Sequence, residues 1–249
     1  MLSSGYTNKS FRLIKEVVGM KKTIMAGLLA VAGAANSATV TLYQNDFDTP
    51  VSVASGVTVS LGGVTTLTGG GGLSGFSGNF LWNYAAGNPA ASTTLTLSGL
   101  PTHSAVTVSY RFAYVDSWDS TNGTVAPDFF TMTLDGSTLL QITCNNASGT
   151  VCDQGPNFLA QRNVFSSGWA DATRDVSEST AHTADSLTLV LFAGGNGWQG
   201  GTDESWALDG LTVTAEVSNP NNNVPEPSAL ALMGLSLVGL AARRRRLGM

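Results

Sequence analysis

The sequence predicts an all-β protein, an antiparallel jelly-roll β-sandwich, and three observations lead to this fold class. Between residues 38 and 218, apolar and polar side chains alternate with a period of two, the pattern of strands with one buried face. Threonine and valine dominate these runs, because branched side chains suit a pleated, half-buried surface. No stretch of this body carries an apolar stripe at helical spacing, so we expect two packed antiparallel sheets rather than a parallel sheet with crossover helices.

The expected strands are separated by turns rich in glycine, asparagine and proline. They are predicted at residues 39–43, 57–61, 93–97, 105–115, 129–134, 138–143, 186–192 and 206–214. The longest of them places four large side chains on one face, which should be the core face: Val106, Val108, Tyr110 and Phe112. Asp135-Gly136 lies between two of the runs and is a strong signal for a tight hairpin.

The body is strongly acidic. Residues 38–223 keep 15 of the 17 acidic residues but only three of the 12 basic ones, Arg111, Arg162 and Arg174. Three positive against fifteen negative side chains give the body a formal charge of −12, compared with −5 for the whole chain. Such a surface repels phosphate backbones and anionic lipid headgroups, so nucleic acid is excluded as a partner. Acidic loops instead favour divalent cations or keep an exported protein in solution.

A secretory signal peptide is predicted at residues 20–37. A positive start at Met20-Lys-Lys22 precedes an apolar run at 24–35, and small residues at Ala35 and Ser37 suit cleavage after Ser37. Residues 1–19 have mixed charge and no clear apolar face, so we expect Met20 to be the natural start and residues 1–19 to be a mis-called extension. The Sec export machinery is therefore an expected partner.

A second targeting segment is expected at residues 224–249, after a polar linker at 219–223 and the predicted sandwich domain at 38–218. An acidic, proline-bounded box comes first, formed by Val224, Pro225, Glu226 and Pro227. An apolar run at 228–242 follows, and a basic cluster closes it: Arg243, Arg244, Arg245 and Arg246. As a helix the run spans about 22 Å, short of the roughly 30 Å hydrocarbon core, and the arginines can reach the interface and hold that end in the cytoplasm. We therefore predict a single transmembrane sorting helix at 228–242.

This tail resembles the PEP-CTERM sorting signal of Gram-negative bacteria, because the box, the helix and the arginine cluster occur together in that order. The resemblance implies that a membrane-embedded exosortase processes the tail near Pro225–Pro227. It also implies that the protein is held transiently in the inner membrane and that the body then reaches the cell surface or extracellular matrix. An ordinary single-helix anchor is the alternative.

Several segments of the body are also similar to a widespread group of PEP-CTERM-anchored sandwich proteins. The group mostly lacks an assigned activity, so this resemblance implies the fold rather than a function. The segments cover most of the body and include residues 79–83, 88–91, 97–101, 116–119, 127–130 and 197–210.

Two cysteines, Cys144 and Cys152, are separated by seven residues. In an exported chain, a pair at this spacing predicts a disulfide that closes a small loop. A loop of this size stabilises the fold by about 2–3 kcal/mol.

Acidic residues beside the first and last strands are candidates for a structural Ca²⁺ site. The first and last strands of a jelly roll often come together, and Ca²⁺ takes six to eight oxygen ligands, so both groups of acids should contribute. Carbohydrate-binding jelly rolls, which the body resembles in layout, commonly hold such an ion, and Asp46 and Asp209 are the first choices. The candidate ligands are Asp46, Asp48, Asp203, Glu204 and Asp209. The alternative is that they are solvated turn formers.

A second acidic group follows the long central strand and predicts either a further cation site or a ligand rim, with a pair of Asx-type turns around a packed Trp118 as the alternative. Aromatic faces stack against sugar rings, so the tryptophans near it are candidates for a glycan platform, whereas Trp206 should be in the core. The rim candidates are Asp116, Trp118, Asp119, Asp128 and Trp198.

Catalytic patterns are weak in this sequence. His103 beside a turn and His182 in a polar stretch are both expected to be exposed, and neither belongs to a serine-hydrolase or metalloprotease motif. The primary interpretation is a secreted, cell-surface or matrix-associated protein that is not an enzyme, with extracellular polysaccharide as a possible partner. The alternatives are a calcium-dependent carbohydrate-binding module and a glycoside-active enzyme that uses paired carboxylates.

Overall fold

A computed structural model describes residues 37–69, 72–121, 124–145, 151–152, 158–162, 165, 169–218 and 232–237. The chain divides into two compact units, of which one comprises residues 35–223 and the other combines residues 1–34 with 224–249. The body is the first unit. The extension and all but the last residue of the predicted signal peptide lie outside the described residues, and that last residue, Ser37, is the first residue of the first strand.

The body is built from fifteen strands that make two main sheets and one small hairpin. Their bounds are β1 Ser37–Asn45, β2 Ser52–Val53, β3 Thr58–Gly63, β4 Leu67–Gly69, β5 Asn79–Asn83, β6 Thr93–Ser98, β7 His103–Asp116, β8 Asp128–Leu134, β9 Ser137–Ile142, β10 Cys144–Asn145, β11 Val151–Cys152, β12 Phe158–Arg162, β13 Ala170–Ala181, β14 Ser186–Gly195 and β15 Glu204–Ser218. Each of the eight predicted strand segments overlaps an observed strand, which confirms the all-β class.

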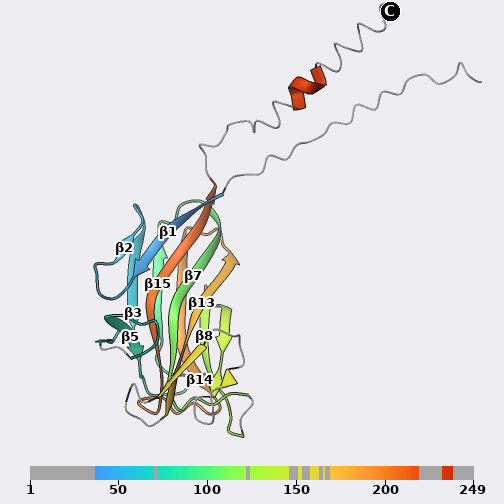
Figure 1. The fold of residues 1–249 in the computed structure, drawn as a ribbon. Coiled ribbons are helices and arrows are strands. Elements are labelled where there is room, and N and C mark those ends of the chain that lie inside the picture. The colour runs from blue at the N-terminus through green and yellow to red at the C-terminus, as the bar shows by residue number, and fades with distance from the viewer. Residues whose placement is uncertain are drawn as a thin grey trace, which may run out of the picture. The chain divides into compact units, whose positions relative to one another are not determined.

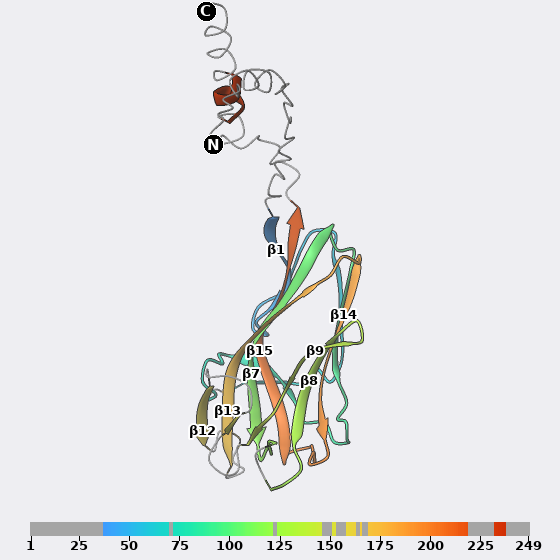
Figure 2. The same cartoon turned by 90° about the vertical axis from the view of Figure 1, so that its right-hand side faces the viewer.

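The two main sheets pack face to face. The larger has eight strands in the order β12-β13-β7-β15-β1-β2, with β5 paired to β15 and β4 to β5, and the smaller has the order β3-β6-β14-β8-β9. The chain alternates between the sheets from β6 to β7, β7 to β8, β13 to β14 and β14 to β15, which is the layout of a jelly roll. Figure 2 shows the layers side on, with β15, β7 and β13 in one and β14, β8 and β9 in the other.

The first and last strands of the body pair antiparallel, as expected. Ser37 lies opposite Ser218 and Asn45 opposite Leu211, so the two ends of the body leave the sandwich side by side (Figure 1). Glu204 begins β15 and therefore lies at the other end of that strand.

The core lies between the sheets, and β7 contributes to it along most of its length. The four predicted core-face residues Val106, Val108, Tyr110 and Phe112 are buried there, together with Trp206. The opposite face of the end of β7 packs Ala113 and Val115 into a second, smaller cluster with Phe80. This end of the strand is buried on both faces, so the sequence changes there from alternation to a continuous apolar run.

Two local predictions have different outcomes. The Asp135-Gly136 hairpin is confirmed, since both residues have positive φ (50° and 80°), as the tightest hairpin turn requires. Strand β13 was not predicted, because two thirds of its residues are polar and, of its apolar ones, only Ala172 and Val176 belong to the main core.

Candidate metal centre

Three carboxylates gather at the end of the sandwich where β15 begins. Glu204 is the first residue of β15 in the larger sheet, and Asp128 is the first residue of β8 in the smaller one. Asp119 lies in the loop after β7, and its main-chain carbonyl accepts a hydrogen bond from the Asp128 N–H at 2.9 Å. The group therefore contains one acid from each main sheet and one from the loop after β7.

The three side chains are close enough to share one ion. A carboxylate oxygen from each of Asp119, Asp128 and Glu204 lies within 4.8 Å of the others. Asp128 and Glu204 are fully buried, and Asp119 is half-buried. One Asp128 oxygen, Oδ2, accepts a hydrogen bond from the Asp119 main-chain N–H at 2.7 Å. The other, Oδ1, is buried and has no hydrogen-bond partner in the described part of the chain.

The pKa values of all three carboxyl groups are raised, so the surrounding protein does not stabilise their negative charges fully. Burial, the nearby charges of Glu204 and Asp119, and a side-chain hydrogen bond with Glu204 raise the pKa of Asp128 to about 8, although the hydrogen bond from the Asp119 N–H lowers it. Burial also raises the pKa of Glu204, although the Gln199 and Gly200 N–H groups donate to its carboxylate. Burial raises the pKa of Asp119 as well. Buried carboxylates in this situation hold protons or a cation.

The donor set suits a hard divalent cation. Three carboxylates supply oxygen ligands of the kind that Ca²⁺ prefers, and loop carbonyls and water can complete its shell. The buried, unpartnered Oδ1 of Asp128 is the atom that an ion would satisfy. No histidine or cysteine belongs to the group, so a transition-metal site is less well suited.

The structure divides the five predicted calcium ligands between two places, because Asp46, Asp48 and Asp209 lie near one another whereas Asp203 and Glu204 lie at the start of β15. Glu204 faces the main core with Trp206 and Leu208, whereas Asp209 points to the opposite face of β15, because side chains alternate along a strand. Asp209 accepts a hydrogen bond from the Ser77 N–H at 3.0 Å, and burial, with the nearby charges of Asp48 and Asp46, raises its pKa.

The other three predicted ligands all accept hydrogen bonds from the protein. Asp46 caps its own turn by accepting from the N–H groups of Asp48 and Thr49, and the Thr49 bonds lower its pKa. Asp48 accepts from the Asn79 N–H at 2.8 Å. Asp203 is next to Glu204 in sequence but is exposed to solvent, and it accepts a hydrogen bond from the Ser117 hydroxyl at 3.1 Å.

The predicted ligand rim is also rearranged. Two of its three acids, Asp119 and Asp128, belong to the carboxylate group, but Trp118 is 0% exposed and Trp198 only 6%, so neither indole is a platform for a sugar. The two indoles meet edge to face with ring centroids 5.1 Å apart, and the Trp118 Nε1–H donates to the Ser205 carbonyl at 2.7 Å. The loop after β7 folds back over the end of the sandwich, and so it buries the rings that the sequence places near a loop.

Asp116, the remaining rim residue, is part of the support of this loop. It is buried at the end of β7 with φ 69°, and its N–H donates to the Asp171 carboxylate at 3.0 Å. Asp116 lies directly opposite Glu204 in the β7–β15 pair. That register, which sequence reasoning did not supply, is the link that brings Asp119 to Glu204.

The predicted disulfide agrees with the backbone pairing around it. Cys144 and Cys152 lie opposite each other in the antiparallel β10–β11 hairpin, and Cys144 is buried. The side chain of Cys152 lies outside the described residues, so the bond itself stays a prediction.

Of the predicted transmembrane run at 228–242, the structure describes a helix at residues 232–237. Within the described residues, no helix is both long enough and apolar enough to cross a membrane. The box at 224–227 and the arginine cluster at 243–246 lie outside the described residues.

Comparison with known families identifies the tail. Residues 223–246 match the PEP-CTERM protein-sorting motif, which confirms the resemblance noted in the sequence. The motif is the signal of an exported, exosortase-processed protein. A search of curated proteins finds no match to the chain.

Several solved structures share features of the β-fold at low similarity. The CBM22-1 xylan-binding domain of Paenibacillus barcinonensis Xyn10C aligns at 14% identity over 74% of this chain and 99% of its own, with a TM-score of 0.36. A family 35 carbohydrate-binding module from an environmental isolate aligns at 18% identity over 67% and 95%, with a TM-score of 0.34. The CBM2 module of the evolved Dit of Lactobacillus casei BL23 phage J-1 aligns at 12% identity over 73% and 97%, with a TM-score of 0.33. Similarity at this level assigns no function to this chain.

Proposed function

Because the chain carries a PEP-CTERM protein-sorting motif, we propose that it is a non-enzymatic protein of the cell surface or extracellular matrix, delivered there through an exosortase. The motif at residues 223–246 is the observation that carries the proposal. The body of formal charge −12, which contains no lysine, is consistent with an exported, soluble surface domain. Sec export and a transient stage in the inner membrane belong to the same proposal.

A structural Ca²⁺ ion in the body is the second part of the proposal. Asp119, Asp128 and Glu204 would hold it, and the ion would tie the start of β8 to the start of β15. The complete burial of Asp128 and Glu204 supports ion binding over glycoside cleavage, because a hydrolytic acid pair must reach a polysaccharide chain.

Sorting is tested by surface delivery in a host that contains an exosortase. Replacing Pro225, Glu226 and Pro227 by alanine should abolish release or display of the body, and the uncleaved precursor should accumulate in the membrane fraction. The measurement is surface protease accessibility together with fractionation, in the parent host and in one that lacks the exosortase.

A linker variant provides the control for this experiment. Replacing Asn221, Asn222 and Asn223 by serine keeps length and polarity and should leave delivery unchanged. Equal surface amounts of the Pro-Glu-Pro variant, or of the natural chain without exosortase, would refute the proposed route.

Carbohydrate binding is the second candidate function, and an aromatic group on the larger sheet favours it. Trp82 on β5 stacks against Phe165 with centroids 4.9 Å apart and tilts against Tyr84 at 4.6 Å. Tyr84 is 40% exposed, and the Trp82 Nε1–H is held by the Ser205 hydroxyl at 2.9 Å, so one ring of the group presents a free surface on a fixed support. The acidic body favours neutral over anionic polysaccharides.

Glycan binding is tested by affinity electrophoresis in gels that contain neutral polysaccharides. If this surface binds sugar, Tyr84→Ala should weaken retardation by about tenfold in affinity, or about 1.4 kcal/mol. Val59→Ala, which removes an exposed apolar side chain from the smaller sheet, should have no effect. Unchanged retardation of the Tyr84 variant would exclude this surface.

A further inference from the structure

The two histidines of the chain meet inside the sandwich, which corrects the expectation that both are exposed. His103 begins β7 and His182 follows β13, and they are only 5% and 8% exposed. Their rings lie edge to edge and nearly coplanar, with centroids 4.9 Å apart and an interplanar angle of 15°, and His103 Nε2 lies 2.6 Å from His182 Nδ1.

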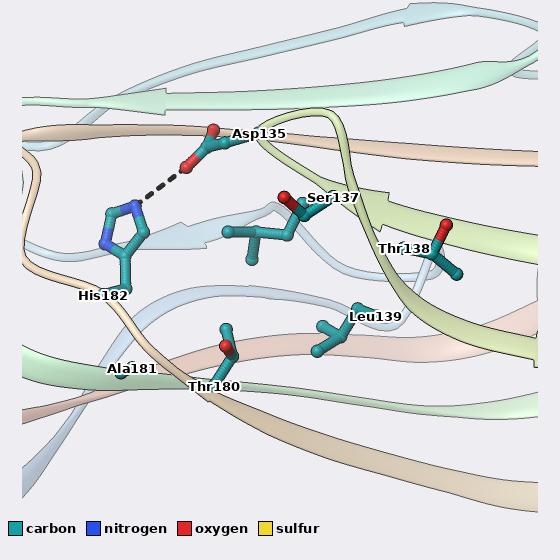
Figure 3. A pocket seen from close by; sticks show the side chains of 8 residues that line it. Asp135, Ser137, Thr138, Leu139, Thr180, Ala181 and His182 are labelled. Atoms are coloured by element: carbon teal, nitrogen blue, oxygen red, sulfur yellow. Dashed lines mark hydrogen bonds and ion pairs between the residues drawn. The ribbon is translucent and has the colours of Figure 1, made fainter.

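Each ring also uses its other nitrogen. His103 Nδ1 lies 2.6 Å from the Pro101 carbonyl oxygen, and His182 Nε2 lies 3.0 Å from Oδ2 of Asp135. Figure 3 shows the second contact at the edge of a pocket of about 200 Å³, which is lined by Asp135, Ser137, Thr180 and His182 among others. The other oxygen of Asp135 accepts from the Thr188 N–H at 2.7 Å, so this carboxylate is fixed in place.

The number of protons in this chain of contacts follows from its two ends. A carbonyl and a carboxylate only accept hydrogen bonds, so His103 Nδ1 and His182 Nε2 must each carry a proton. The two inner nitrogens then face each other at 2.6 Å, and two lone pairs at that distance repel. Three protons on the four ring nitrogens give each of the three contacts one hydrogen. With only two protons, one contact has no hydrogen. With four, the N–H groups of the two inner nitrogens point at each other.

We propose that His103 and His182 share one proton and act as a singly charged tie between the two sheets. The tie connects β7 of the larger sheet, through the turn after β13, to the β8–β9 hairpin of the smaller sheet. It lies at the opposite end of β7 from Asp119, Asp128 and Glu204, so the inference does not depend on the metal centre. The pocket beside His182 and Asp135 gives protons a route to solvent.

The charges around the pair are consistent with one shared positive charge. Asp135 is the acid that contacts it directly. Asp185 lies in the turn before β14, where its main-chain carbonyl accepts from the Leu100 N–H, and its side chain is exposed. The Glu216 carboxylate on β15 accepts a hydrogen bond from the Thr39 hydroxyl on β1. No basic side chain contacts the pair in the described residues.

The test is NMR of the full chain in detergent micelles, with ¹⁵N-labelled histidine. We expect a strongly deshielded proton coupled to both His103 Nε2 and His182 Nδ1, and the charge on the two rings should total about one across pH 5 to 8, where ordinary histidines change charge. His103→Gln should abolish the bridging signal. Asp135→Asn should move loss of the shared proton to lower pH, and Asp185→Asn should change neither.

Three results would overturn the proposal. The first is independent titration, with both rings fully charged at pH 5 and both neutral at pH 8. The second is a pair that is neutral throughout this range. The third is a signal that a chelator removes, which would place a metal ion rather than a proton between the rings. The amide spectrum of each variant checks in the same sample that the fold is retained.

Discussion

Calcium should raise the melting temperature of this protein, and the rise should be larger at pH 8 than at pH 5. Asp128 has a pKa raised to about 8 in the folded state, so without an ion the folded state holds a proton that the unfolded state has released. Stability from this group is complete below the unfolded pKa, near 4, and is lost as pH rises toward 8, by a few kcal/mol in total. An ion replaces the proton, so calcium binding strengthens with pH and releases protons.

Two variants separate this effect from general acidity. Asp128→Asn should remove most of the pH dependence between pH 5 and 8 and abolish the calcium-induced rise, because the neutral amide neither needs a proton nor supplies a charged ligand. Asp185→Asn changes an exposed acid and should retain both effects. Differential scanning fluorimetry of each variant, in calcium and in EGTA and at pH 5 and pH 8, measures both effects.

The outcome that would contradict the site is clear. If millimolar calcium leaves the melting temperature of the natural chain unchanged at pH 8, Asp119, Asp128 and Glu204 hold protons rather than an ion. If Asp46→Asn or Asp209→Asn abolishes a calcium effect that Asp128→Asn retains, the ion lies in the group predicted from the sequence.

Trp118→Ala should be among the most destabilising single substitutions in the body. Trp118 is fully buried, meets Tyr114 and Trp198 edge to face, and donates its indole N–H to the Ser205 carbonyl. Removing the ring leaves a large cavity and an unpaired carbonyl, at a cost of about 3–5 kcal/mol, which lowers the melting temperature by roughly 10 °C.

The exposed Trp169, with 43% of its surface accessible, provides the comparison. Trp169→Ala should change the free energy of unfolding by less than about 1 kcal/mol. If Trp118→Ala instead leaves thermal melting intact and weakens binding to a polysaccharide, the ring is a ligand platform after all and its burial is wrong.

Much of the fold was predictable because short stretches of sequence indicate strands and hairpin turns by themselves. Alternation places Val106, Val108, Tyr110 and Phe112 on one face whatever the partners are, and Asp135-Gly136 specifies its hairpin by backbone conformation alone. Strand β13 was not predicted because its position is set by pairing with β7, while most of its own side chains are polar and show no clear alternation.

The candidate site was predictable only in part. The sequence singled out Asp119, Asp128 and Glu204, but in two different groups, because residues from a loop and two sheets come together only through pairings that are distant in sequence. The same reasoning placed Glu204 with Asp209, although five positions along a strand put them on opposite faces. The burial of Trp118 and Trp198 depends on where a loop folds, which alternation does not encode.

The sequence by itself determined the class of fold, the acidic character of the body and the PEP-CTERM motif, since each is a property of neighbouring residues. Only the tertiary structure decided which acids share a centre, which tryptophans are buried and that His103 meets His182. These contacts join residues that lie up to 85 positions apart for the acids and 79 for the histidines. Such pairs are fixed by strand register and sheet packing, and no local pattern specifies either.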